Sequence, residues 1–162
     1  MKGPSIAAWH GPRACLVTPA MSLPGGNSPK GMTTSTHGPT TVSNIGVAMF
    51  TVADQDAALA FYTEKLGWEV RGDQRFGEND EMRWLEVAPP GSTARLALNP
   101  PMRGEPGGSA IGVETADVHA EHERVSAIEG VEISTPLMDM GGAPPMFSVA
   151  DPDGNHVWIV QT

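Results

Sequence analysis

The stretch at residues 149–161 reads V-A-D-P-D-G-N-H-V-W-I-V-Q. Its centre is a turn, because Pro152 fixes φ, Gly154 accepts a positive φ, and the two aspartates can bond neighbouring backbone groups. Apolar runs flank the turn at Met146–Ala150 and His156–Gln161. The pattern predicts a β-hairpin at the end of the chain.

The second strand of this hairpin has two distinct faces. Side chains alternate along a strand, so His156, Trp158 and Val160 share one face and the intervening residues share the other. We expect one of these faces to line a cavity. The residue at position 158 then matters most for function.

The predicted domain, which ends with this hairpin, divides into two similar halves. In the first half, Asp54 is a predicted N-cap, Leu59, Tyr62 and Leu66 form an apolar stripe at helical spacing, and Gly67 follows as a C-terminal glycine. The predicted order is β-α-β-β-β. Strands are expected at 45–52, 68–73, 82–88 and 93–99, with the helix at 57–66 and the first strand buried on both faces.

The same order recurs after a Pro- and Gly-rich linker at 99–109. A strand is expected at 110–114, a helix from Asp117 through Ile128, and a short strand at 131–133 before the hairpin. A period of one half-domain indicates a duplicated supersecondary unit. We therefore divide residues 43–162 into units at 43–100 and 108–162.

Three stretches carry a family resemblance. They are V-A-D-Q-D-A-A-L-A-F-Y-T-E-K-L-G-W at 52–68, R-W-L-E-V-A-P-P-G at 83–91 and the hairpin at 149–161. Together they resemble the vicinal oxygen chelate superfamily, which includes glyoxalase I, the bleomycin resistance proteins and the extradiol dioxygenases. The resemblance implies an α+β fold in which two βαβββ units form a curled mixed-sheet funnel, and it places the active or binding site in that funnel.

In metal-dependent members of this superfamily, two side chains from each unit converge on a divalent ion. The resemblance puts Val47 and Arg95 at two of these positions, with Leu96 as the alternative to Arg95 if the register slips. It puts Ala110, or Ser109, and Trp158 at the other two. Val47, Ala110 and Trp158 are not metal ligands, and Arg95 repels cations. We expect no metal cofactor.

The five histidines support this expectation. His10 and His37 precede the predicted domain, and His119 and His122 fall on the second predicted helix. Only His156 lies on a predicted strand. An unconventional site made of His156, Glu86 and Glu114 is the alternative, and it would hold a divalent metal.

Six residues are expected to contact a ligand in the funnel: Val47, Met49, Trp84, Arg95, Met146 and Trp158. Tryptophan offers a flat stacking surface and methionine adapts to irregular ligands, and we expect Phe147 near the same pocket. Core packing is the stronger expectation for Trp84. Arg95 either waits for an anion or pairs with Glu86, and the sequence favours neither. Apolar residues that simply fill the funnel are equally compatible with the pattern.

The leading hypothesis is a metal-independent, bleomycin-resistance-like protein that binds a small, partly apolar molecule. The alternatives are enzymes. One is a metal-dependent lyase or isomerase of the glyoxalase type, or a dioxygenase. The other is a metal-free enzyme in which Arg95 stabilises an anion and His156 or Glu86 acts as base.

Charge and composition limit the partners. The formal net charge is −9, and none of the 19 acidic residues lies within residues 1–40. An acidic domain repels nucleic acid and anionic lipid but suits a cationic ligand. The single cysteine, Cys15, excludes an internal disulfide, and we expect a cytoplasmic protein.

Residues 1–42 are rich in Gly, Pro, Ser and Thr, and we expect a disordered leader there. One hypothesis is that translation begins at Met32, which the intact mass of the native product would test. By resemblance to the superfamily we also expect a homodimer.

Overall fold

The computed structural model describes residues 41–102 and 104–162. Residues 1–40 of the predicted leader, with Cys15, lie outside the described residues. No helix in the described part of the chain is both long and apolar enough to cross a membrane.

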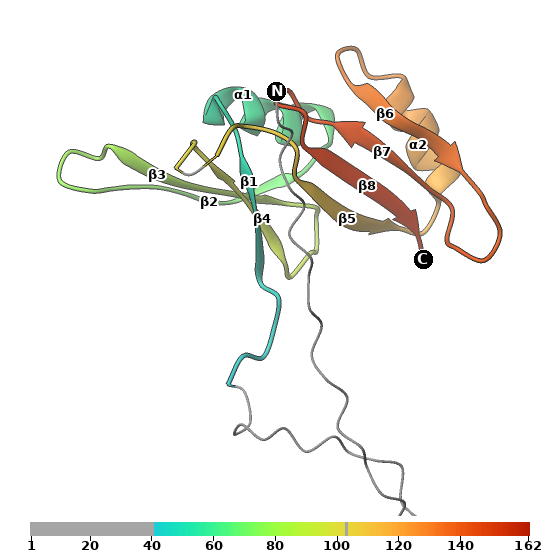
Figure 1. The fold of residues 1–162 in the computed structure, drawn as a ribbon, viewed down its shortest axis with the longest axis horizontal. Helices are drawn as coiled ribbons and strands as arrows, with labels where there is room; N and C mark the ends of the chain where they lie inside the picture. Colours follow the sequence, from blue (N-terminus) through green and yellow to red (C-terminus); the bar gives the residue numbers. More distant parts are fainter. Residues whose placement is uncertain (1–40, 103) are drawn as a thin grey trace, which may run out of the picture. The chain divides into compact units, whose positions relative to one another are not determined.

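Two four-stranded sheets form the framework, each in the order expected of a βαβββ unit (Figure 1). In each sheet the strands that come first and last along the chain of that unit pair in parallel, and the other neighbouring strands pair antiparallel. The predicted α+β fold is confirmed, although the sheets are not closed. The first sheet has the order β1 (Val47–Thr51), β4 (Arg95–Asn99), β3 (Met82–Ala88), β2 (Glu69–Phe76), and the second has β5 (Ala110–Thr115), β8 (His156–Gln161), β7 (Met146–Ala150), β6 (Glu132–Met138).

The helices begin at the predicted caps. The Asp54 carboxylate accepts hydrogen bonds from the first backbone N–H groups of α1 (Gln55–Ala60), and Asp117 caps α2 (Val118–Ser126) in the same way. The first helix continues as one π-helical segment, η1 (Phe61–Lys65), which the periodicity did not reveal. Helix α2 packs against β6, β7 and β8.

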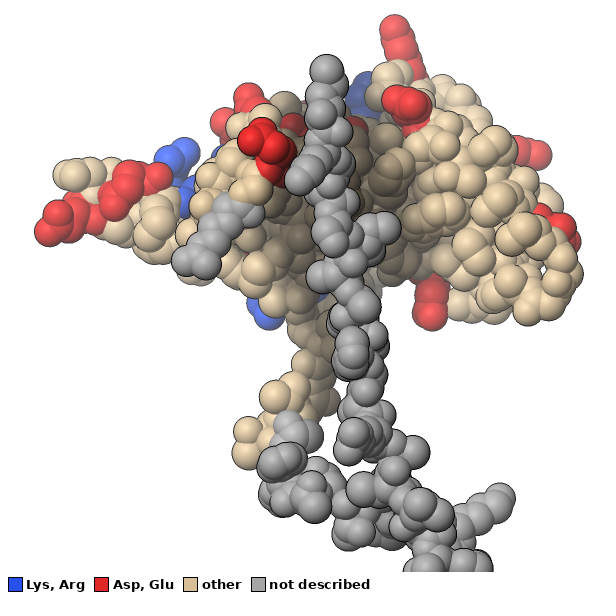
Figure 2. Space-filling view, viewed as in Figure 1, with Lys and Arg blue, Asp and Glu red and all other residues tan. Residues whose placement is uncertain are grey.

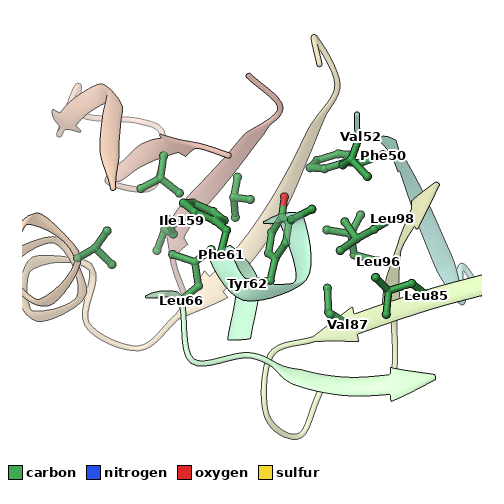
Figure 3. Close-up of a cluster of buried hydrophobic side chains, with 14 of the residues drawn as sticks. Phe50, Val52, Phe61, Tyr62, Leu66, Leu85, Val87, Leu96, Leu98 and Ile159 are labelled. Atoms are coloured by element: carbon green, nitrogen blue, oxygen red, sulfur yellow. The ribbon is translucent and has the colours of Figure 1, made fainter. Parts of the chain in front are cut away.

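One hydrophobic core joins the two units. Tyr62 is fully buried at its centre, with Phe50 from β1 on one side and Ile159 from β8 on the other (Figure 3). The Tyr62 ring packs nearly perpendicular to Phe61 and at a tilt of 43° to Trp68, with ring centroids 5.4 and 5.1 Å apart. Residues from both sheets and both helices therefore share one buried volume.

Two expectations about strands were wrong. Strand β1 is buried on one face only, because Phe50 is 1% exposed whereas Met49, on the opposite face, is 57% exposed. Strand β6 runs through Met138 rather than ending at Ile133. It tolerates Pro136 because it is an edge strand, where a missing backbone N–H breaks no inner hydrogen bond.

The turn at 151–155 holds the two units together. Asn155 is fully buried, donates to the Thr51 carbonyl of β1 at 3.1 Å, and accepts from the backbone N–H of Ser109 at 3.2 Å. The Asp151 carboxylate accepts from the Tyr62 hydroxyl at 3.1 Å and from the Asn155 amide at 2.9 Å. Burial and the neighbouring Asp151 carboxylate both raise the pKa of Tyr62, so its phenol stays neutral.

Candidate ligand-binding site

Each sheet has one face turned toward the core and one turned away from it, which we call its open face. On β3, Leu85 and Val87 are fully buried in the core, so Trp84 and Glu86 belong to the open face by alternation. Trp84 is partly buried there, which was not the preferred expectation. The open face of the first sheet carries Val47, Met49, Trp84, Glu86, Arg95 and Ala97.

The second sheet follows the same rule. Phe147 on β7 is fully buried in the core. The expectation that it lies near the ligand pocket was therefore wrong. Its neighbour Met146 lines the open face, because adjacent residues of a strand point to opposite faces. By register and alternation, the open face of the second sheet carries Ala110, Glu114, Met146, Ser148, His156, Trp158 and Val160.

Glu86 and Arg95 form the charged group of the first open face. The Glu86 side chain is only 7% exposed, and the Arg95 guanidinium reaches it from β4 with an Nη1 to Oε2 distance of 3.2 Å. Gly72 pairs with Glu86 across β2 and β3, and a Cβ at Gly72 would lie 3.2 Å from the Glu86 carboxylate. The missing side chain therefore leaves room for the carboxylate. Of the two interpretations of Arg95, its pairing with Glu86 is the one present.

Strand register shows which residues of the two units occupy equivalent places among the four positions that the resemblance assigns to metal ligands. Met49 pairs with Ala97, and Gly112 pairs with Trp158. Met49 and Gly112 each lie five residues before the N-cap aspartate of their unit. The structural counterpart of Trp158 is therefore Ala97, and the placement of Arg95 or Leu96 at that position was wrong by register. Ala97, like Val47 and Ala110, has no side-chain donor atom.

A conventional metal centre does not fit these residues. Among residues 41–102 and 104–162, no three His, Cys, Asp or Glu side chains come together as a possible metal site. The alternative grouping of His156, Glu86 and Glu114 is therefore not formed. Glu86 is paired with Arg95, and His156 bonds to Ser134 instead.

His156 is part of a short chain of polar groups. Its Nδ1 atom lies 3.0 Å from the Ser134 hydroxyl of β6, which lies 2.8 Å from the Ser148 hydroxyl of β7. Ser148 is fully buried, and Ser134 and His156 are partly buried. The chain places one polar group two residues from Trp158, on the same face of β8.

A cleft of about 630 Å³ lies beside the open faces, between the β1–β4 edge of the first sheet and β5 of the second. Its walls include Trp68, Leu96, Ile111 and the turn at 89–92. Arg95 also lines it, and it is the only one of the six predicted ligand contacts to do so. The remaining five lie on the open faces or at their edges, outside this cleft.

Charge is unevenly spread over the surface. The part of the second sheet visible in Figure 2 is largely free of Lys, Arg, Asp and Glu, whereas acidic side chains gather at the tip of the β2–β3 hairpin. On the core side of β3, Arg83 donates to Asp56 and Asp73, each at 2.6 Å. The Arg83 guanidinium holds the pKa of Asp73 below its ordinary value. Arg83 therefore has a structural role in these salt bridges and is not a residue of the ligand site.

The profile of the glyoxalase/bleomycin resistance protein/dioxygenase superfamily matches residues 44–159. The chain belongs to this superfamily. That match spans both βαβββ units and confirms the resemblance first suggested by the motifs at 52–68 and 149–161.

Individual members of the superfamily agree with this assignment. The uncharacterized protein YetH of Bacillus subtilis (strain 168) is 35% identical over 118 residues, covering 70% of this chain and 94% of YetH. A superfamily member from Sphaerobacter thermophilus DSM 20745 is 30% identical with a TM-score of 0.67, covering 76% of this chain and all of that one. TnmS3, an antibiotic binding protein from Streptomyces sp. CB03234, is 29% identical with a TM-score of 0.66, covering 76% and 98%.

Sequence reasoning missed Ser134 and Ser148. Ser148 could have been found, because it alternates with the apolar residues Phe147 and Val149 and so must share a face with Met146. Ser134 could not, since the register of β6 against β7 shifts between Ile133 and Thr135. Such a bulge changes which face a residue occupies.

Proposed function

We propose that this superfamily member binds a small, partly apolar molecule over its open faces and needs no metal to do so. The observation that carries the proposal is the composition of those faces. Trp84, Trp158 and Met146 are partly exposed on them and Met49 is largely exposed. None of the positions that the resemblance assigns to metal ligands carries His, Cys, Asp or Glu. Such a surface offers stacking and dispersion contacts rather than a Lewis acid.

The likeness to TnmS3 supports a binding role. TnmS3 is an antibiotic binding protein, and it shares 29% of its aligned residues with this chain. We therefore propose a sequestration or resistance role, with an aromatic antibiotic as ligand. The acidic formal charge of −9 favours a cationic one.

Tryptophan fluorescence tests the binding site directly. We expect cationic aromatic antibiotics to quench the protein's emission with saturation, and Trp158→Phe to weaken binding about fivefold, since one aromatic contact contributes about 1 kcal/mol. Trp68→Phe is the matched control, because Trp68 lines the neighbouring cleft and lies outside the open faces. Saturable binding that both variants weaken equally would place the ligand elsewhere.

Metal independence has its own test. We expect the apparent stability of EDTA-treated protein to stay constant when Mn, Fe, Co, Ni or Zn is added. A metal that binds the native state at a hundredfold excess over Kd would add about 2.7 kcal/mol. A clear thermal shift with one bound metal per chain would favour the lyase or dioxygenase alternative instead.

A further inference from the structure

The Ser148–Ser134–His156 chain has only one direction that uses all its hydrogens. Ser148 is fully buried, and its only side-chain hydrogen bond among the described residues is the one to Ser134. Each serine hydroxyl carries one hydrogen and can donate once. The direction of the chain therefore depends on what the buried Ser148 hydrogen can reach.

Consider first that His156 donates from Nδ1 to Ser134. Ser134 must then donate to Ser148, and the Ser148 hydrogen is left buried without an acceptor, which is unfavourable. In the opposite direction, Ser148 donates to Ser134 and Ser134 donates to Nδ1 of His156. Every hydrogen then has an acceptor, and the second direction is preferred.

We infer that this chain fixes His156 as the neutral tautomer with its proton on Nε2. The imidazole then offers a hydrogen-bond donor rather than a base. His156 is thus a specificity-determining residue of the open face, and the idea that it acts as a general base loses support.

This assignment deepens the proposed function and rests on it for the ligand class. His156 and Trp158 stand two residues apart on the same face of β8. A donor beside an indole ring suits an aromatic molecule that carries a carbonyl oxygen. The site should therefore prefer aromatic ketones, or compounds with similar acceptors, over hydrocarbons of equal size.

Nitrogen-15 NMR of the histidine side chains tests the tautomer without any ligand. We expect His156 in the full-length protein at neutral pH to carry its proton on Nε2. Ser148→Ala removes the reason for one direction while keeping the Ser134 contact, so it should give a mixture of tautomers. Thr135→Ala is the matched control. Thr135 lies on β6 in register with Ser148 of β7, but its side chain bonds to neither His156 nor Ser134. A proton on Nδ1, or a charged ring, would overturn the inference.

The ligand class is tested with 2-acetylnaphthalene and 2-ethylnaphthalene as probes. We expect the ketone to bind about tenfold more tightly, and Ser148→Ala to reduce that preference while Thr135→Ala preserves it. Equal binding of the two probes would overturn the ligand class. If neither probe binds while NMR shows the Nε2 proton, the proposed function fails for aromatic ligands and the tautomer assignment stands.

Discussion

Asn155 connects three parts of the chain through one side chain. Its amide donates to the Thr51 carbonyl and to the Asp151 carboxylate, and its carbonyl accepts from Ser109. The partners belong to β1, to the hairpin turn and to the residue before β5. A fully buried amide in this position gives stability only while all of its groups are paired.

We expect Asn155→Ala to lower the free energy of unfolding by about 3 kcal/mol, because it removes several buried hydrogen bonds and leaves partners unpaired. Urea denaturation measures the change. Asn79→Ala is the control, since the Asn79 side chain is exposed and only its backbone is bonded, and it should change stability by less than about 0.5 kcal/mol. Similar losses of stability in both variants would contradict the role of Asn155 in joining these parts of the chain.

Tyr62 gives a stability contribution that depends on pH. Its pKa is raised in the folded protein by burial and by Asp151, whereas in the unfolded chain it titrates near its usual value of about 10. Stabilisation is therefore complete below pH 10 and falls as the pH rises above that value, by up to about 1.4 kcal/mol per unit.

The single tyrosine of the chain makes this measurable. We expect native protein to show no tyrosinate absorbance at pH values where the urea-unfolded chain ionises. We also expect the stability difference between wild type and Tyr62→Phe to shrink above pH 10. Tyrosinate absorbance that rises near pH 10 while the protein is still folded would disprove the burial argument.

At the scale of elements, the linker that precedes β5 docks on the hairpin turn. Gly107 donates from its backbone to the Thr51 carbonyl at 3.2 Å, and Gly108 donates to the Gly154 carbonyl at 3.2 Å. Both glycines have positive φ, at 86° and 74°. A Cβ at Gly107 would collide with the Asp153 carbonyl oxygen, whereas one at Gly108 meets nothing within 4 Å.

This difference gives a matched pair of variants. We expect Gly108→Ala to cost about 1 kcal/mol for the left-handed backbone alone. Gly107→Ala should cost at least about 1 kcal/mol more, because the methyl group also displaces the turn. Chemical denaturation of the two proteins compares them directly. Equal stabilities would mean that the linker can move away from the turn without loss.

At the scale of the whole molecule, the open faces leave apolar side chains uncovered. Met49, Phe76 and Met82 are 57%, 44% and 41% exposed, and the register of β2 against β3 puts the last two on the same face as Trp84 and Glu86. Exposed apolar surface of this kind is typical of interaction sites. We propose that a second copy of the chain covers it and closes the ligand site.

Sedimentation velocity tests the proposed homodimer. We expect wild-type protein to sediment as a dimer and Met49→Lys to shift it toward monomer, because a charge would be buried at the interface. Met102→Lys is the control, since Met102 is 76% exposed and lies in the linker between β4 and β5, in neither sheet. A wild-type monomer at the highest soluble concentration would contradict the proposal.

The order of the elements, the capped helices, the final hairpin and the superfamily could all be predicted from the amino-acid sequence. The sequence also showed that Val47 and Ala110 cannot bind a metal. These features depend on residue type and on spacing along the chain, so neighbouring residues are enough to read them. Even Phe147 could have been assigned to the core, because alternation places it opposite Met146.

Which side chains contact one another could be learned only from the folded structure. Asn155 bonds to Thr51, 104 residues away in the sequence, and a bulge in β6 brings Ser134 to His156. Arg95 had two equally favoured partners until packing placed the buried Glu86 carboxylate beside it. Such contacts depend on how the sheets twist, shift register and pack, and no local pattern of residues records these distances.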